Sequence, residues 1–336
     1  GHATRCIPII RRLLDHGLSP IIASDGRALL LLQKEFPQLK MYALPAYNIV
    51  YRSHNMVWNM AWQMPKILRA IYLEQKATEK IVAAEKIEVI ISDNRYGCFA
   101  RSTQNILMTH QINIKIPWTW MERVVAWANH RMIRRFDACW VPDFADTPRL
   151  AGTLSLAGDL PKVRYVGALS RMKKQKRVKQ IDLLIVLSGP EPQRTHLEQL
   201  LLKALVGCPF RTLLVQGLTD REEREQLREG LERVAYLTSE ALNRAILSAG
   251  VVLCRSGYSS IMDLVALGKK AILIPTPGQT EQEYLAERFA AQGICCVQKQ
   301  NQLDLTEAME EVQKTKGFSA LQRTDQLLEC AIKLLL

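Results

Sequence analysis

Residues 251–293 read VVLCRSGYSSIMDLVALGKKAILIPTPGQTEQEYLAERFAAQG, and this stretch decides the class of fold. A short apolar run, Val251–Cys254, ends in an Arg-Ser-Gly turn, after which the spacing of apolar residues predicts a helix. A second apolar run, Ala271–Ile274, leads into a Pro/Gly turn and another helical segment. Strands that alternate with helices in this way predict an α/β fold with a parallel sheet.

The turn after the first of these strands also predicts a binding site for an anion. The first N–H groups of a helix have no intrahelical partner and lie at the positive end of its dipole, so a small-residue turn there can hold a phosphate or diphosphate. Asp263 lies seven residues after Ser256, about two helical turns on, where it can reach a ribose hydroxyl. A Ser-Gly turn alone is common in parallel sheets. Together with Asp263 and the Gln/Glu-rich segment 279–283, it indicates a nucleotide-sugar site.

These residues resemble the donor-binding motif of GT-B glycosyltransferases of the family 28 type, which includes the bacterial lipid-intermediate N-acetylglucosaminyltransferase of peptidoglycan synthesis. The resemblance implies two Rossmann-like domains that face a cleft. In that family an Arg-Ser-Gly turn holds the donor diphosphate, an acidic residue holds the ribose, and a Gln-Gln or Gln-Glu pair reads the sugar. The matching donor-binding positions are Arg255, Ser256, Gly257, Asp263, Gln282 and Glu283, and Gln279 of the same segment is a further donor-binding candidate. Asp263 stands where Glu is usual, so its reach is one methylene shorter.

The chain has 336 residues, enough for two domains of about 150 residues each. No apolar run approaches the roughly 20 residues that span a bilayer, and no signal-peptide pattern is present. The eight cysteines form no Cys-x-x-Cys pair, which indicates reduced thiols in the cytoplasm.

Basic residues are concentrated in the first half of the chain. The first 166 residues carry 22 Lys and Arg against 13 Asp and Glu, while the remainder carries 23 against 20. All six tryptophans also lie in the first half. A basic, Trp-rich half predicts an anionic surface as its partner, either phospholipid headgroups or nucleic acid.

Strands and helices alternate twice along the chain. The apolar runs of the first half predict strands at Pro20–Ser24, Lys40–Leu44, Val89–Ser92, Ile106–Thr109, Ala138–Val141 and Arg164–Gly167. Those of the second half predict strands at Leu183–Leu187, Thr212–Val215, Val234–Leu237, Val251–Cys254, Ala271–Ile274 and Cys295–Val297. The basic segment 170–180 has no apolar period and is interpreted as a solvated linker in preference to a headgroup or nucleic-acid patch. We therefore expect a first domain at 1–167, a linker at 168–181 and a donor domain at 182–336.

The chain starts with Gly1-His2-Ala3-Thr4-Arg5, which resembles the end of the family's Gly-x-Gly-x-Gly-His motif. We expect a first strand and a glycine turn upstream of it. The His of this motif is a candidate for the catalytic base in the resembled family. A helix N-terminus disfavours imidazolium and so keeps such a His able to accept a proton. The competing interpretation of His2 is a terminal residue without a function.

Polar residues follow two strands of the first half. Asp93 and Asn94 come after the run that ends at Ser92, and a carboxylate there can act as a base, orient His2 or only stabilise a turn. His110 and Asn113 follow the next strand and resemble the family's His-Glu-Gln-Asn segment, without its Glu. We therefore predict catalytic roles for Asp93 and His110 and place Asn94 and Asn113 on the acceptor side, against the alternative that all four are structural.

Two further turns in the second half are weaker donor-binding candidates. Ser188 and Gly189 follow the strand at Leu183–Leu187, as the family's phosphate loop does, but with fewer glycines. Leu237 and Thr238 follow a strand at the spacing where family members clamp the uracil with backbone groups.

Tryptophans and cations occur together in two predicted helices. Trp58, Trp62, Lys66 and Arg69 share a helical stripe, and a second cluster contains Trp118, Trp120, Trp127, Arg123, Arg131, Arg134 and Arg135. Tryptophan beside cations is typical of a membrane interface. The alternative is that the rings are core and the cations are solvated.

The sequence thus predicts an inverting glycosyltransferase that moves a sugar from a nucleotide-sugar, by family analogy a UDP-sugar, to a lipid-linked or glycan acceptor. The resemblance implies no cofactor and no metal, and the sequence contains no carboxylate cluster resembling a divalent-ion site. We expect a cytoplasmic protein, peripheral at the inner face of the cell membrane. The alternatives are a nucleotide-sugar hydrolase of the same fold, whose family shares the Gly-His-x-x-Arg motif, and a non-catalytic protein that binds nucleic acid. The second is disfavoured because no nucleic-acid-binding motif is present.

Overall fold

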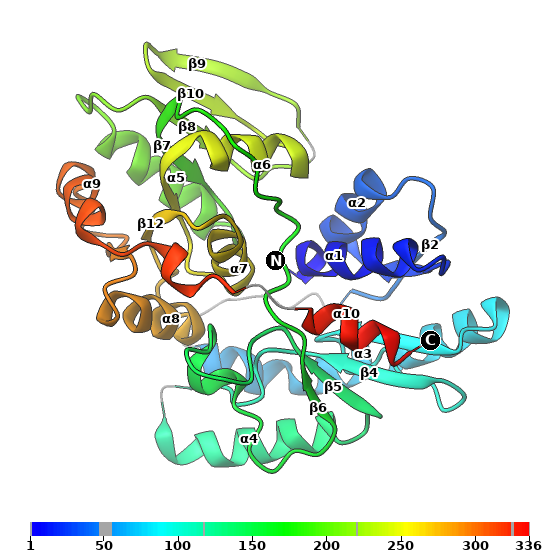
Figure 1. Cartoon of the computed structure of the whole chain (residues 1–336). Coiled ribbons are helices and arrows are strands. Elements are labelled where there is room, and N and C mark those ends of the chain that lie inside the picture. The colour runs from blue at the N-terminus through cyan, green and yellow to red at the C-terminus, as the bar shows by residue number, and fades with distance from the viewer. Residues whose placement is uncertain (1, 47–55, 117, 220, 324–325, 336) are drawn as a thin grey trace. The chain divides into compact units, whose positions relative to one another are not determined.

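The computed structural model describes residues 2–46, 56–116, 118–219, 221–323 and 326–335. The chain divides into two compact units (Figure 1). The N-terminal unit contains His2–Leu169 together with Thr324–Leu336, and the C-terminal unit contains Ser170–Arg323. Segment 170–180, which the sequence suggested as a linker, therefore belongs to the C-terminal unit, and the last helix belongs to the N-terminal one.

The N-terminal unit contains two parallel sheets among its described residues. Strands β3 (Val89–Asp93), β4 (Gln104–Met108), β5 (Ala138–Val141) and β6 (Val163–Tyr165) form one sheet in that order, and β1 (Ile22–Ser24) pairs with β2 (Met41–Ala43) in the other. The helices of the unit are α1 (His2–Asp15), α2 (Gly26–Glu35), α3 (Met56–Glu85), α4 (Thr119–Ile133) and α10 (Leu327–Lys333), with a short 3-10 turn at Gly152–Ser155. Ile133 of α4 packs with buried Leu107 and Val141 of the larger sheet, so α4 covers one of its faces (Figure 1).

The C-terminal unit contains a seven-stranded sheet in the order β13-β12-β11-β7-β8-β10-β9. Its strands are β7 (Ile181–Val186), β8 (Thr212–Val215), β9 (Arg224–Arg228), β10 (Leu231–Val234), β11 (Ala249–Cys254), β12 (Lys270–Leu273) and β13 (Cys296–Val297). Its helices are α5 (Gln193–Ala204), α6 (Ser239–Ser248), α7 (Tyr258–Leu267), α8 (Thr280–Ala291) and α9 (Leu305–Lys314), followed by a 3-10 turn at Phe318–Leu321. All neighbouring strands are parallel except the edge strand β9.

The order of these strands creates a switch point beside β7. The chain moves from β7 outward through β8 to β10, and then returns to place β11 on the other side of β7. Val186 of β7 pairs with Cys254 of β11, so the two strands end level with each other. Ligands of open α/β sheets bind outside the carboxyl ends of the strands at such a point. The turns that begin at Leu187 and Arg255 therefore flank the expected site.

Three elements differ from the prediction. Strand β9 was not predicted, because its residues, REQLR, are charged and exposed and show no apolar alternation. Strand β10 occupies Leu231–Val234, so the predicted strand at Val234–Leu237 was placed about three residues too late. The apolar spacing of Leu321–Leu336 also predicts a final helix, whereas the structure has a 3-10 turn that ends at Leu321 and the short helix α10. Among the described residues, no helix combines the length and apolarity needed to cross a membrane.

Candidate functional site

The turn between β11 and α7 forms the centre of the candidate site in the C-terminal unit. Gly257 is the N-cap of α7, with φ −68° and ψ 141°, a conformation that any residue can adopt. A Cβ atom built on Gly257 would have no protein atom within 4 Å. The packing of the protein therefore does not require glycine here, and open space lies next to the helix N-terminus. Backbone N–H groups at such an end attract anions.

Arg255 is buried directly behind this turn, with 1% of its surface exposed. Its Nη1 donates to the carbonyls of Ile274 and Pro275, at 3.2 and 3.1 Å. Its Nη2 donates to the carbonyl of Gln193 at 3.2 Å and to Oε1 of Gln300 at 2.6 Å. These acceptors are all neutral, and Nε is buried without a hydrogen-bond partner in the described part of the chain. Burial lowers the pKa of Arg255 to about 10, which still leaves it charged near neutral pH. An uncompensated cation thus lies at the switch point.

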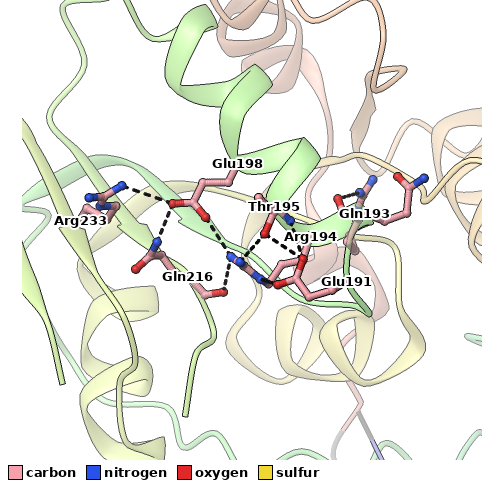
Figure 2. Close-up of polar contacts among 8 residues, drawn as sticks. Glu191, Gln193, Arg194, Thr195, Glu198, Gln216 and Arg233 are labelled. Atoms are coloured by element: carbon pink, nitrogen blue, oxygen red, sulfur yellow. Dashed lines mark hydrogen bonds and ion pairs between the residues drawn. The ribbon is translucent and has the colours of Figure 1, made fainter. Parts of the chain in front are cut away.

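The β7–α5 loop is the second turn that flanks the expected site. Ser188 and Gly189 are exposed, and Gly189 has φ +107°, which favours glycine. Glu191 accepts hydrogen bonds from Nε of Arg194 at 2.6 Å and from Oγ1 of Thr195 at 2.8 Å (Figure 2). These bonds fix the loop onto the first turn of α5.

Behind the loop, Arg194 joins a buried polar network shown in Figure 2. Its Nη1 donates to Glu198 at 2.9 Å, and Glu198 also accepts from Gln216, which follows β8, at 2.6 Å. Arg233 of β10 lies 3.6 Å from the same carboxylate. The network ties the β7–α5 loop to the carboxyl ends of the neighbouring strands. This network was not predicted from the sequence, although the i,i+4 spacing of Arg194 and Glu198 was a visible signal.

The predicted sugar-reading residues gather at the start of α8. Ser256 Oγ donates to the carbonyl of Gln282 at 2.7 Å, which joins α8 to the Arg-Ser-Gly turn. Gln282 also accepts from the backbone N–H of Thr276 and donates to Gln279, while Glu283 accepts from the N–H of Gly278 at 2.9 Å. The structure therefore brings Gln279, Gln282 and Glu283 next to Ser256, and their side chains make local bonds there.

Asp263 lies on α7 against the segment that the sequence suggested as a linker. Ser170 Oγ donates to Asp263 Oδ1 at 2.6 Å, and Arg171 donates to Oγ of Ser239 at 2.7 Å. Burial raises the pKa of Asp263, and Ser170 and Arg171 act in the opposite direction. Ser170 and Arg171 thus lie at the candidate site, and this was not predicted from the sequence. Met172, an apolar residue within the basic run 170–180, was the sequence signal that this segment packs against the domain, and it is buried in the structure.

Leu237 and Thr238 lie in the loop between β10 and α6. Thr238 caps α6, since its Oγ1 accepts from the backbone N–H of Ala241 at 3.3 Å, and Leu237 is half-buried. The loop is at the carboxyl edge of the sheet, on the β8 side of the switch point.

In the N-terminal unit, Asp93 and His110 are brought together by Arg5 of α1. Arg5 donates to both oxygens of Asp93 and to Nδ1 of His110 at 3.0 Å. His2 is the first residue of α1, and its side chain lies outside the described part of the structure.

The two predicted acceptor-side asparagines lie in different environments. Asn94 has φ +54°, a left-handed conformation that Asn tolerates, and its N–H donates to Met108 at the end of β4. Asn113 donates from Nδ2 to the carbonyls of Thr153 and Leu156, at 3.0 and 2.8 Å, and so holds the 3-10 turn. The structure therefore gives Asn113 a structural contact and leaves its predicted acceptor role a hypothesis.

Two helices of the N-terminal unit present mixed apolar and basic surfaces. On α4, Val124 and Trp127 are 58% and 66% exposed, and the exposed arginines are Arg123 and Arg131 on the helix and Arg134 and Arg135 directly after it. On α3, the exposed apolar residues are Met64, Leu68, Tyr72 and Leu73, with Lys66, Arg69 and Lys76 beside them. Trp140 is fully buried in β5 and is a core residue. The side chains of Trp58, Trp62 and Trp120 lie outside the described residues.

Comparisons with known proteins agree with this architecture. The model of the glycosyltransferase family 28 C-terminal domain matches residues 196–329. An uncharacterized glycosyltransferase of Methanopyrus kandleri is 20% identical over 297 residues, which are 84% of this chain and 85% of the relative. The glycotransferase of kitacinnamycin superposes with a TM-score of 0.69 at 14% identity, over 99% of this chain and 95% of the other. MurG of Acinetobacter baumannii superposes with a TM-score of 0.59 at 10% identity, over 99% and 95%.

Two α/β units with these matches define a protein of the GT-B fold class, which confirms the predicted fold. The match to the glycosyltransferase family 28 C-terminal domain includes the Arg-Ser-Gly turn, so it supports the resemblance that this motif predicted.

Proposed function

We propose that the protein is an inverting, metal-independent glycosyltransferase that uses a nucleotide-sugar, with UDP as the nucleotide, and a lipid-linked or glycan acceptor. One observation carries the proposal. Arg255, a buried guanidinium whose partners among the described residues are all neutral, lies at the switch point directly behind the open helix N-terminus at Gly257. Burying an uncompensated charge is costly, and a diphosphate bound in front of it would supply the missing negative charge.

In the proposed reaction, an acceptor hydroxyl oxygen attacks the anomeric carbon as the bond from that carbon to the diphosphate oxygen breaks. The nucleoside diphosphate leaves with the electron pair, and the hydroxyl proton passes to a base, for which His2 is the candidate. Negative charge grows on the leaving oxygen, so donors fixed in advance at the α7 N-terminus, together with Arg255, would stabilise the transition state more than the ground state.

Asp263 and the α8 residues complete the proposed donor site. Asp263 would bind the ribose, and Gln282 and Glu283 would bind sugar hydroxyls after exchanging their present local bonds for bonds to the ligand. Because the cations and helix N–H groups already oppose the diphosphate charge, we expect turnover to continue when divalent ions are chelated.

The exposed apolar and basic surfaces of α3 and α4 support an acceptor that is held at a membrane. Trp127 and its neighbouring arginines have the chemistry of the headgroup region, where the ring lies at the interface and the cations meet anionic lipid. We therefore propose that the protein works as a peripheral protein at the cytoplasmic face of the membrane.

The proposal is tested by isothermal titration of UDP, TDP and UDP-GlcNAc into the full chain and its Arg255→Lys variant. Lysine keeps the charge and loses the forked geometry, so we expect UDP to bind about tenfold or more weakly. Arg228→Lys is the matched control. Arg228 also donates to two carbonyls, those of Leu205 and Cys208. These residues precede β8, so the contacts lie at the edge of the sheet where the parallel strands begin, away from the proposed donor site. Equal weakening by both variants, or no binding of any nucleotide by the wild type, would overturn the donor site.

Transfer and hydrolysis are then separated by incubating a bound UDP-sugar with and without anionic lipid extract. Glycosyl transfer predicts slow release of free sugar without the extract and a labelled lipid product with it. Rapid release of free sugar in both cases would establish the hydrolase instead.

A further inference from the structure

Arg5 connects three segments of the N-terminal unit that are far apart in the sequence. Its side chain extends from the first turn of α1 to Asp93, the last residue of β3, and to His110, two residues after β4. Its Nε lies 2.9 and 3.0 Å from the two carboxylate oxygens, and Nη2 also donates to Oδ1. Arg5 is 2% exposed and His110 is 5% exposed, so the contacts are shielded from water.

The chemistry of the guanidinium fixes the protonation of His110. Arginine has five N–H donors and no acceptor, so the 3.0 Å contact from Nη1 requires a lone pair on Nδ1 of His110. A neutral imidazole with a lone pair on Nδ1 carries its proton on Nε2. His110 in this arrangement can donate a hydrogen bond from Nε2, and it has no nitrogen available to accept a proton while Arg5 is in place.

The carboxylate oxygens of Asp93 are likewise already engaged in hydrogen bonds. Both of its oxygens accept from Arg5, and Sγ of Cys6 lies 3.5 Å from Oδ2 as a further donor. Burial and the neighbouring carboxylate raise the pKa of the Cys6 thiol, so it remains protonated. A carboxylate surrounded by donors at these positions serves as an anchor for Arg5 and is poorly placed to take a proton from an acceptor hydroxyl.

We propose that Arg5 is a positioning residue of the acceptor-side site, which anchors on Asp93 and holds His110 as an Nε2–H donor. This inference rests on the proposed glycosyl transfer, and it changes the assignment of roles within it. Neither Asp93 nor His110 is the base. The base is then a third group, and His2 lies on the same helix as Arg5, three residues earlier. His110 instead donates a hydrogen bond at the carboxyl end of β4, the edge where α/β sheets bind ligands.

The direct test is the tautomer of His110, measured by long-range ¹H–¹⁵N NMR on the full chain labelled at histidine. A His110→Gln variant assigns the signal among the six histidines. We expect a neutral ring with the proton on Nε2 in the wild type, and a change of tautomer or a mixture in Arg5→Gln. A wild-type ring protonated on Nδ1, or on both nitrogens, at neutral pH would overturn the proposal. This readout requires no substrate.

Kinetics provide the second test. Arg5→Lys, which cannot contact Asp93 and His110 with one planar fork, should lower kcat on the order of a hundredfold, while KM for the donor and UDP affinity stay within about twofold. Added guanidinium ion should restore part of the kcat of Arg5→Ala. Loss of UDP binding in Arg5→Lys, or unchanged kcat, would contradict a positioning role. Failure of UDP to bind the wild type would instead refute the proposed function and leave the tautomer result standing.

Discussion

At the scale of single residues, Arg255 shows why a motif alone does not define a role. The sequence indicates a cation that contacts the diphosphate, whereas the structure places its guanidinium behind the turn, bonded to the carbonyls of Ile274, Pro275 and Gln193. Arg255 therefore both builds the site and gives it positive charge. Gln300 supplies the shortest of these contacts.

Replacing Gln300 by Ala should weaken the site through Arg255. The variant leaves Nη2 of a buried guanidinium without its 2.6 Å partner, and the loss of a hydrogen bond to a charged group costs about 1.5–3 kcal/mol. We expect a lower free energy of unfolding in urea and weaker UDP binding. Gln302→Ala, an exposed neighbour, is the control and should leave both unchanged. A Gln300→Ala protein as stable as the wild type would show that the contact does not hold Arg255.

Replacement by alanine should affect two glycines differently. Gly257→Ala adds a Cβ to open space and should leave the melting temperature nearly unchanged. Gly97→Ala would place its Cβ 2.5 Å from both Glu74 Oε2 and the Ile71 carbonyl of α3, and should destabilise the protein by about 1–3 kcal/mol. Thermal unfolding of the two variants checks this. A large loss of stability in Gly257→Ala would mean that the turn is packed.

Asp263→Asn should stabilise the free protein at neutral pH. Because the folded-state pKa of Asp263 is raised above its ordinary value of 3.8, the ionised form disfavours folding, and this effect is complete above the folded pKa. Asparagine retains an acceptor for Ser170 and removes the charge. The gain in melting temperature should shrink as the pH falls through the folded pKa toward about 4, and nucleotide affinity should fall. A variant less stable than the wild type at neutral pH would contradict the effect of burial.

At the scale of elements, the sequence predicted most of the strands, because apolar runs bounded by Gly, Pro and Ser are a local signal. It located β5 and β8 at their observed bounds. It missed β9, whose pairing depends on a neighbouring strand and not on its own charged residues. The same contrast between local signals and long-range contacts explains which site residues could be predicted. Arg255 and His110 follow strands and could be predicted, whereas Arg5, Arg171 and Gln300 join the site through contacts across the fold that no spacing reveals.

At the scale of the whole molecule, the charge of the chain is concentrated in the N-terminal unit, in keeping with an anionic partner for that unit. The exposed stripe of α4 that contains Val124, Trp127 and Arg131 is the part most suited to lipid. Its apolar and charged members would act together, so binding should respond to salt and to substitutions of both kinds.

Full-length protein should co-sediment with vesicles that contain anionic phospholipid and only weakly with neutral vesicles. Trp127→Ala and Arg131→Glu should each reduce binding several-fold, since about 1 kcal/mol is expected per basic residue near such a surface. Lys203→Glu, on α5 of the C-terminal unit, is the control. Equal binding to neutral and anionic vesicles would exclude the electrostatic part of the proposal.

The central claim is that the helix N-terminus at Gly257 binds the diphosphate of a nucleotide-sugar. The most direct measurement is isothermal titration of UDP into wild type and Gly257→Ala, whose added methyl group enters the space that the diphosphate would occupy. We predict micromolar binding to the wild type and at least tenfold weaker binding to the variant, with matching unfolding curves. Equal affinities of the two proteins, or no binding by folded wild type, would contradict the account.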